Sequence, residues 1–140
     1  MSGHGCTLTL GVLPERAETL ALYDSVGWAA YTQQPDVLMS ALAGSTTVVT
    51  ARDGRGGLVG LARVISDGVS IAYLQDVLVH PDHHRRGLGA ALVDAAFEPH
   101  RSVRQNVLMT DTEARQAAFY ESLGFTEMHA ADVRGYVRFR

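Results

Sequence analysis

The sequence predicts an α+β fold in a single domain over residues 1–140. A chain of this length can bury one hydrophobic core. Its 46% of hydrophobic and 19% of charged residues are typical of a globular protein rather than a disordered one. Segments with the period of strands and segments with the period of helices follow one another without a linker, a repeat or a low-complexity tract.

The first half of the chain is predicted to form one strand, two helices and two further strands. Pro14 is suited to open the first helix, and Glu15 and Glu18 are favourable near the positive N-terminal end of that helix. The glycines in residues 53–57 predict a turn between two strands. The expected elements are strands at 7–13, 46–51 and 58–65 and helices from Pro14 to near Gly27 and from Pro35 to Leu42.

The second half is predicted to contribute four strands and two helices. Leu88 and Leu92 recur on one face of a helix, as do Phe119 and Leu123, and Gly124 is a typical helix stop. The expected elements are strands at 70–80 and 103–110, helices from Gly87 to before Pro99 and at 114–123, and a closing hairpin of 125–128 and 133–139.

A basic loop with two glycines joins a strand to a helix at residues 80–89. The first N–H groups of a helix lack intrahelical partners, and the helix dipole is positive there. Gly87 and Gly89 allow a ligand to approach the backbone, and Arg85 and Arg86 add positive charge. The loop therefore predicts a phosphate or pyrophosphate site.

Two other glycine-rich phosphate motifs do not fit this loop. A Walker loop has Lys and Ser or Thr after its last glycine, where this chain has Ala90 and Ala91. A dinucleotide fingerprint has a third glycine where this chain has Leu92, and it belongs to an early strand–helix–strand unit.

Two segments of the chain carry the motifs of one family. Residues 84–90 read His-Arg-Arg-Gly-Leu-Gly-Ala, against a family pattern of Gln/Arg-x-x-Gly-x-Gly/Ala after a strand; His84 is the departure. Residues 117–125 read Ala-Ala-Phe-Tyr-Glu-Ser-Leu-Gly-Phe, against Phe/Leu-Tyr-x-x-x-Gly-Phe. Both segments resemble the GCN5-related N-acetyltransferases, the GNAT superfamily. Gly27-Trp28-x-x-Tyr31 is similar to an element of a small single-domain branch.

The resemblance implies the GNAT acyl-CoA N-acyltransferase fold, of α/β/α type around a mixed sheet. The order of that fold is strand, two helices, three strands, helix, strand, helix and two strands, which is the order expected here. The resemblance also implies an acyltransferase that moves an acetyl group from acetyl-CoA to a primary amine, by direct attack in a ternary complex.

Acetyl-CoA (coenzyme A) is the implied cofactor. In the family, backbone N–H groups of the strand before the loop hold the pantetheine arm and polarise the thioester carbonyl, and the loop holds the pyrophosphate. Glu113 stands where many relatives have an asparagine that contacts pantetheine. The implied cofactor-binding residues are Val77, Leu78, Val79, His84, Arg85, Arg86, Gly87, Leu88, Gly89 and Ala90.

Asp76 and Tyr120 are the candidates for catalysis. A carboxylate in an otherwise apolar strand is costly unless it is paired or functional. Relatives often have an acidic residue there beside the acceptor amine, so Asp76 is expected to be the general base. The alternatives are that Asp76 pairs with Arg63 and that the base is water or a histidine, namely His80, His83 or His84. In the family the hydroxyl at the position of Tyr120 faces the thioester sulfur, which implies that Tyr120 protonates the leaving thiolate.

Trp28 and Tyr31 lie in a loop-like stretch between the first two helices. In the family this region walls the acceptor pocket, which makes both residues candidates for substrate binding. Aromatic walls suit an aryl-alkyl or another small primary amine. Packing of the helix connection is the alternative for Trp28.

Composition disfavours several other classes of protein. The net charge is −3 with no basic block outside residues 83–86, so no nucleic-acid partner is expected. Cys6 is the single cysteine, which excludes an internal disulfide and a multi-thiolate site, and no metal is expected. No apolar run approaches the length of a membrane span and the N-terminus is unlike a signal peptide, so we expect no membrane partner and a cytoplasmic location.

Other functions are compatible with the same residues. The chain would serve as a non-catalytic regulatory module that binds acetyl-CoA, as a partner-binding domain, or as an acetyltransferase for a protein lysine or N-terminus. The exposed edges of the predicted hairpin are also compatible with a homodimer.

Overall fold

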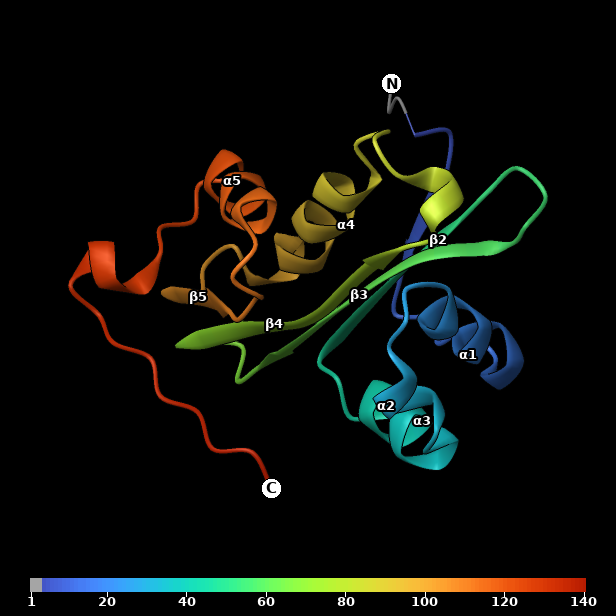
Figure 1. Cartoon of the computed structure of the whole chain (residues 1–140), viewed down its shortest axis with the longest axis horizontal. Helices are drawn as coiled ribbons and strands as arrows, with labels where there is room; N and C mark the ends of the chain where they lie inside the picture. The colour runs from blue at the N-terminus through green and yellow to red at the C-terminus, as the bar shows by residue number, and fades with distance from the viewer. Residues whose placement is uncertain (1–3) are drawn as a thin grey trace. The chain divides into compact units, whose positions relative to one another are not determined.

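The computed structural model describes residues 4–140, which divide into two compact units, residues 4–108 and residues 109–140. The first unit contains a mixed sheet with helices (Figure 1). Its strands are β1 (Thr7–Leu10), β2 (Thr47–Arg52), β3 (Leu58–Ser66), β4 (Ile71–Val79) and β5 (Gln105–Leu108). Its α-helices are α1 (Arg16–Ser25), α2 (Ala29–Thr32), α3 (Pro35–Ala43) and α4 (Leu88–Phe97), and its 3-10 turns are η1 (Pro81–His83) and η2 (Glu98–His100).

The sheet of the first unit has the order β1-β2-β3-β4-β5. Strands β1 to β4 are antiparallel neighbours, and β5 joins β4 in parallel. The parallel pair requires a crossover, and α4 supplies it. The predicted α+β class with a mixed sheet is confirmed.

Helices cover both faces of this sheet. In Figure 1, α4 lies on one face, and α1, α2 and α3 lie together on the other. A hydrophobic cluster packs beneath α1 and α3, and its burial stabilises their contact with the sheet. Its buried residues are Leu22, Tyr23, Leu38, Leu42, Val48, Leu61 and Leu78, with Trp28 and Tyr31 packed against them.

Gly60 sets how closely α4 approaches the sheet. A Cβ at this position would lie 2.9 Å from Leu92 Cδ1 and 3.2 Å from the Cβ of Ala51. Leu92 is completely buried. The absence of a side chain at Gly60 therefore lets α4 pack directly on β3, and this contact places the N-terminal end of α4 beside the end of β4.

Strand β4 is irregular at one point. Arg63 pairs with Asp76 and Val64 pairs with Leu74, so Gln75 is an extra residue in β4. Such a bulge bends a strand and re-aims its side chains. The parallel pairing with β5 also stops at Leu74, while β4 continues to Val79.

Three local predictions for the first unit need correction. Residues 29–32 form the short helix α2 rather than a loop-like stretch. Pro14 lies before α1, and Glu15 caps that helix in a reciprocal capping box with Glu18. Strand β1 ends at Leu10 rather than at residue 13, because Gly11 has a φ of 81°, outside the range of a strand.

The second unit contains helix α5 (Ala114–Ser122) and the 3-10 turn η3 (Met128–Ala131). Gly124 follows α5 with a φ of 92°, in agreement with its predicted role as a helix stop. The predicted hairpin of 125–128 and 133–139 is wrong, because neither segment forms a strand in the structure. A strand needs a neighbour for its backbone groups, and Tyr136 and Phe139 are 85% and 84% exposed instead.

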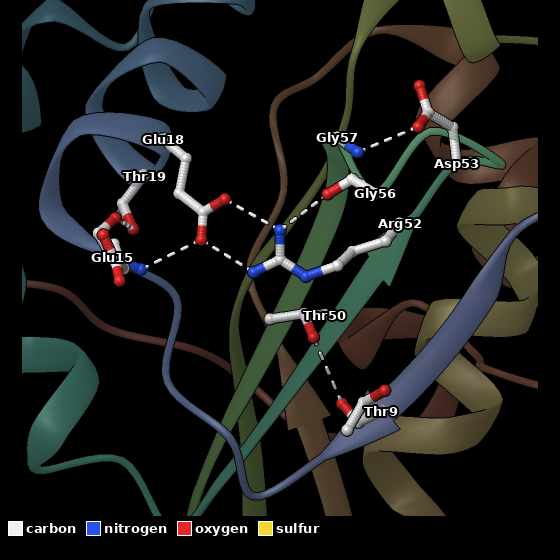
Figure 2. A network of polar contacts seen from close by, with 9 residues as sticks. All are labelled: Thr9, Glu15, Glu18, Thr19, Thr50, Arg52, Asp53, Gly56 and Gly57. Carbon is white, nitrogen blue, oxygen red and sulfur yellow. Dashed lines mark hydrogen bonds and ion pairs between the residues drawn. The ribbon is translucent and has the colours of Figure 1, made fainter.

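An ion pair ties α1 to the end of β2 (Figure 2). Arg52 donates two hydrogen bonds of 2.7 Å to the two carboxylate oxygens of Glu18 and one of 3.0 Å to the carbonyl of Gly56. The hydrogen bond from Arg52 lowers the pKa of Glu18 to about 2, helped by the backbone N–H of Glu15 and opposed by burial. The folded state therefore stabilises the ionised form of Glu18.

We expect this pair to add an acid-sensitive part to the stability. Because the pKa of Glu18 is lower in the folded than in the unfolded chain, its contribution is complete above the ordinary value of 4.5 and is lost as the pH falls toward about 2. Glu18→Gln should therefore lose less stability than wild type between about pH 5 and pH 3 in urea unfolding. Asp36→Asn removes the exposed partner of Arg16, and its unfolding free energy should change with pH as steeply as that of wild type. Equal slopes in wild type and Glu18→Gln would contradict the assignment.

Candidate active site

The loop between β4 and α4 has a strained backbone. Arg85 has a φ of 63° and Gly87 a φ of 79°, both in the left-handed region. That conformation is costly for arginine and is most often found where function requires it. Leu88, Gly89 and Ala90 form the first turn of α4, whose N–H groups have no carbonyl four residues earlier within the helix. These donors and the exposed side chains of Arg85 and Arg86 make the loop a suitable anion site.

Histidines hold this loop against the end of β4. Nε2 of His84 lies 2.9 Å from the carbonyl oxygen of Val79. Nδ1 of His80 accepts a hydrogen bond of 3.1 Å from the N–H of Asp82 and so caps η1. His84 thus departs from the family pattern in residue type, and its Nε2 already has a partner in the carbonyl of Val79, at the end of β4.

The structure brings all the predicted cofactor-binding residues to one end of β4. Val77, Leu78 and Val79 lie on the part of β4 that extends past its pairing with β5. The other seven lie in the loop and first turn that follow directly. An open strand edge can pair with an extended ligand chain, and a basic loop at a helix N-terminus can hold an anion.

Asp76, also on β4, faces helices α1 and α2. Its carboxylate is 3% exposed and Arg63, on β3, is 5% exposed. Nε of Arg63 lies 2.6 Å from Oδ2 of Asp76. Pairing with Arg63, the alternative raised from the sequence, is therefore what the structure contains; whether Asp76 also acts in catalysis stays a prediction.

Two tyrosines complete the shell of Asp76. Tyr23 Oη donates to Oδ2 and Tyr31 Oη donates to Oδ1, each at 3.0 Å. Nη2 of Arg63 and Nε2 of Gln75 approach the Tyr31 oxygen at 3.3 and 3.4 Å. The rings of Tyr23 and Tyr31 meet edge to face with centroids 5.2 Å apart.

The surroundings of Arg63 and Tyr23 raise the pKa of both groups. Burial opposes the charge of Arg63, but the hydrogen bond and the charge of Asp76 outweigh it and raise the pKa of the guanidinium. Burial, followed by the charge of Asp76, raises the pKa of Tyr23 far above its ordinary value, so its hydroxyl stays protonated and remains a donor.

Sequence reasoning placed Tyr31 near the acceptor but missed Tyr23 and Gln75. Tyr23 lies 53 residues before Asp76 and has the spacing of an ordinary core residue of α1. Gln75 gains its position from the bulge. Trp28 packs against Tyr23 with ring centroids 5.8 Å apart, which agrees with the packing alternative for Trp28.

Tyr120 belongs to the second unit, on α5. It is 9% exposed, and its ring packs edge to face on Phe119 with centroids 4.9 Å apart. Burial, with a smaller effect from the charge of Asp111, raises the pKa of Tyr120. Its hydroxyl therefore carries a proton at neutral pH, which a general acid requires.

Within residues 4–140, no group of three or more His, Cys, Asp or Glu side chains is arranged to hold a metal ion. In that same part of the chain, no helix has the length and apolar character needed to cross a membrane.

We expect the Arg63–Asp76 pair to be strongly coupled in stability. Asp76→Ala leaves a buried guanidinium without its counter-charge and should cost about 3–5 kcal/mol of unfolding free energy. The double variant Arg63→Met with Asp76→Leu removes both charges and should be more stable than Asp76→Ala. Urea unfolding of the three proteins measures this difference. A loss below about 1 kcal/mol in Asp76→Ala would contradict a buried, mutually dependent pair.

Comparison with known proteins gives consistent matches. Residues 43–127 match the family described as Acetyltransferase (GNAT) domain. An uncharacterized N-acetyltransferase of Pyropia yezoensis is 31% identical over 107 residues, 74% of this chain and 60% of the relative. A histone acetyltransferase of Glycine max is 33% identical over 118 residues, 75% of this chain and 49% of the relative. The chain thus spans 49% to 60% of the length of these curated relatives.

A solved structure agrees over nearly the whole chain. A GNAT family acetyltransferase from Streptococcus pneumoniae TIGR4 has a TM-score of 0.85 and 30% identity, and the match covers 96% of this chain and 98% of that one. The mixed sheet, the basic loop before α4 and the match of more than half of the chain to the family lead to one conclusion. This chain belongs to the GNAT family of acetyltransferases.

Proposed function

We propose that this protein is an N-acetyltransferase that transfers the acetyl group of acetyl-CoA to a primary amine. One observation carries the proposal beyond family membership. The open part of β4, Val77 to Val79, runs directly into a loop with the strained backbone and the positive charge of an anion site. One ligand with an extended amide arm and a pyrophosphate would use both features together.

In this proposal the chain binds acetyl-CoA in two parts. Val77, Leu78 and Val79 face the pantetheine arm with backbone groups, and an N–H of this strand polarises the thioester carbonyl. Residues 84–90 hold the pyrophosphate. The contact between His84 and the carbonyl of Val79 keeps the strand end and the loop in register, so both parts are positioned before the ligand arrives.

The reaction joins the amine nitrogen to the thioester carbon. The C–N bond forms, the C–S bond breaks, and the electron pair of the C–S bond leaves on sulfur. The nitrogen gives up a proton and the sulfur gains one. Tyr120, with its raised pKa, is the proposed donor to the sulfur, and Asp76 is the proposed acidic residue that supports proton loss from the nitrogen.

The acceptor is proposed to be a small amine that meets Tyr31, with Trp28 behind it as part of the wall. Tyr31 is partly exposed, and it lines a small surface pocket with Ala30, Gln34, Val37 and Leu38. A protein lysine is the second candidate, because a relative that matches 75% of this chain is a histone acetyltransferase.

Thiol release from acetyl-CoA with phenethylamine, glucosamine and a lysine peptide tests both candidate acceptors. Binding of acetyl-CoA without thiol release would indicate a regulatory module instead.

The cofactor loop predicts a specific defect in Gly87→Val. The space above Gly87 is open, so a side chain there would stand where the pyrophosphate is proposed to bind. Gly68→Val is the matched control, because Gly68 has a φ of 78°, also faces open space, and lies in the turn at the other end of β4. Both variants should lose similar stability from backbone strain. Titration calorimetry should show at least tenfold weaker acetyl-CoA binding for Gly87→Val alone, and equal affinities would refute the loop assignment.

Tyr120→Phe tests the proposed acid. The ring and its packing on Phe119 remain, while the proton donor is lost. We expect kcat to fall by about 10²-fold with acetyl-CoA affinity nearly unchanged, since a general acid typically contributes 10²–10⁴. Phe119→Leu, which alters the neighbouring packing and keeps the hydroxyl, should retain most of kcat. Normal turnover by Tyr120→Phe would leave Tyr120 with a packing role only.

A further inference from the structure

The hydroxyl of Tyr31 joins helix α2 to the bulge of β4. It donates to Asp76 Oδ1 at 3.0 Å, and Nε2 of Gln75 approaches it at 3.4 Å. Gln75 and Asp76 are the bulged residue of β4 and its successor, directly after the point where β4 parts from β5. Tyr31 thus marks the place where an acceptor arriving from the helices would meet a thioester held along β4.

The two oxygens of Asp76 have different surroundings. Oδ2 is occupied by Arg63 and by Tyr23, whose side chain is completely buried. Oδ1 accepts a hydrogen bond from the hydroxyl of the partly exposed Tyr31. With the carboxylate itself 3% exposed, its route toward a substrate passes through the Tyr31 oxygen.

The pairing with Arg63 also decides what Asp76 can do. A proton resting on this carboxylate would leave the buried guanidinium without its counter-charge, and such an unpaired buried charge is costly. An ionised carboxylate that accepts the Tyr31 O–H instead strengthens that oxygen as an acceptor, because hydrogen bonds in a chain polarise one another. The oxygen can then accept a hydrogen bond from the amine N–H, which becomes positive as the C–N bond forms and then releases its proton to solvent water.

We infer that Tyr31 is the catalytic residue on the acceptor side and that Asp76, held by Arg63, is a positioning residue that acts through it. The ligand group recognised is the N–H of a primary amine, attacking as the neutral base. This inference rests on the proposed acetyltransferase function. It assigns the acceptor contact to a phenol oxygen rather than to a carboxylate.

Tyr31→Phe and Tyr23→Phe form a matched pair for the test. Each removes one 3.0 Å hydrogen bond to Asp76 and keeps the aromatic ring, and Tyr31→Phe also removes the longer contacts with Arg63 and Gln75 at 3.3 and 3.4 Å. Both should lower the thermal midpoint by a few degrees. With the best amine of the thiol-release screen, Tyr31→Phe should lower kcat/KM by about 10- to 100-fold. Tyr23→Phe should lower it by less than about threefold, and the KM for acetyl-CoA should hold in both.

A double-variant cycle tests the second part of the inference. If Asp76 acts through Tyr31, then Asp76→Asn should reduce kcat/KM strongly in wild type and only slightly in the Tyr31→Phe background. If Asp76→Asn reduces kcat/KM by the same factor in wild type and in Tyr31→Phe, the positioning role of Asp76 is overturned. If Tyr31→Phe and Tyr23→Phe lose kcat/KM equally, the assignment of Tyr31 is overturned. If Asp76→Asn does not fold, the tyrosine pair decides the question. Absence of thiol release by wild type with every amine would instead refute the proposed function.

Discussion

The buried ion pair between Arg63 and Asp76 is the interaction that holds together β3, β4 and the two tyrosines of α1 and α2. The two residues are direct partners across β3 and β4, so the pair fixes the register of the two strands next to the bulge at Gln75. It is buried beneath α1 and α2, where an unpaired charge of either sign would be costly. Its polar atoms in turn bind the hydroxyls of Tyr23 and Tyr31, which attaches both helices to the sheet by directional bonds.

The same strand serves both sides of the proposed reaction. Toward the helices it presents Asp76, and along its edge it offers backbone groups where the pairing with β5 has ended. The bulge at Gln75 makes this division possible, because an extra residue changes which way the following side chains point. In the proposed function, acceptor recognition and cofactor binding both depend on this one short segment, and a change in its register would alter both.

The loop after β4 shows how local strain and tertiary packing combine. Arg85 adopts a left-handed backbone that a non-glycine residue rarely takes. The loop is held on one side by the contact of His84 with Val79 and on the other by α4, which packs closely on the sheet over Gly60. The strain is therefore supported by contacts outside the arginines themselves, and their side chains are exposed to solvent.

The sequence by itself determined the order of the elements up to α5 apart from the short helix α2, the loop with its glycines and arginines, and the family. These are local properties: a strand period, a helix stop and a glycine pattern depend on neighbours in the chain. The final hairpin was predicted wrongly by the same reasoning. The local pattern of residues 133–139 favours a strand, but a strand also needs a neighbour for its backbone groups, and the local pattern does not determine whether one is present. Only the tertiary structure decided that Asp76 is paired, that Tyr23 and Tyr31 divide its two oxygens, and that Gln75 is the bulged residue. Those outcomes depend on which side chains meet across tens of residues in the folded core, and hydrophobic spacing does not distinguish a tyrosine that packs from one whose hydroxyl reaches a buried carboxylate.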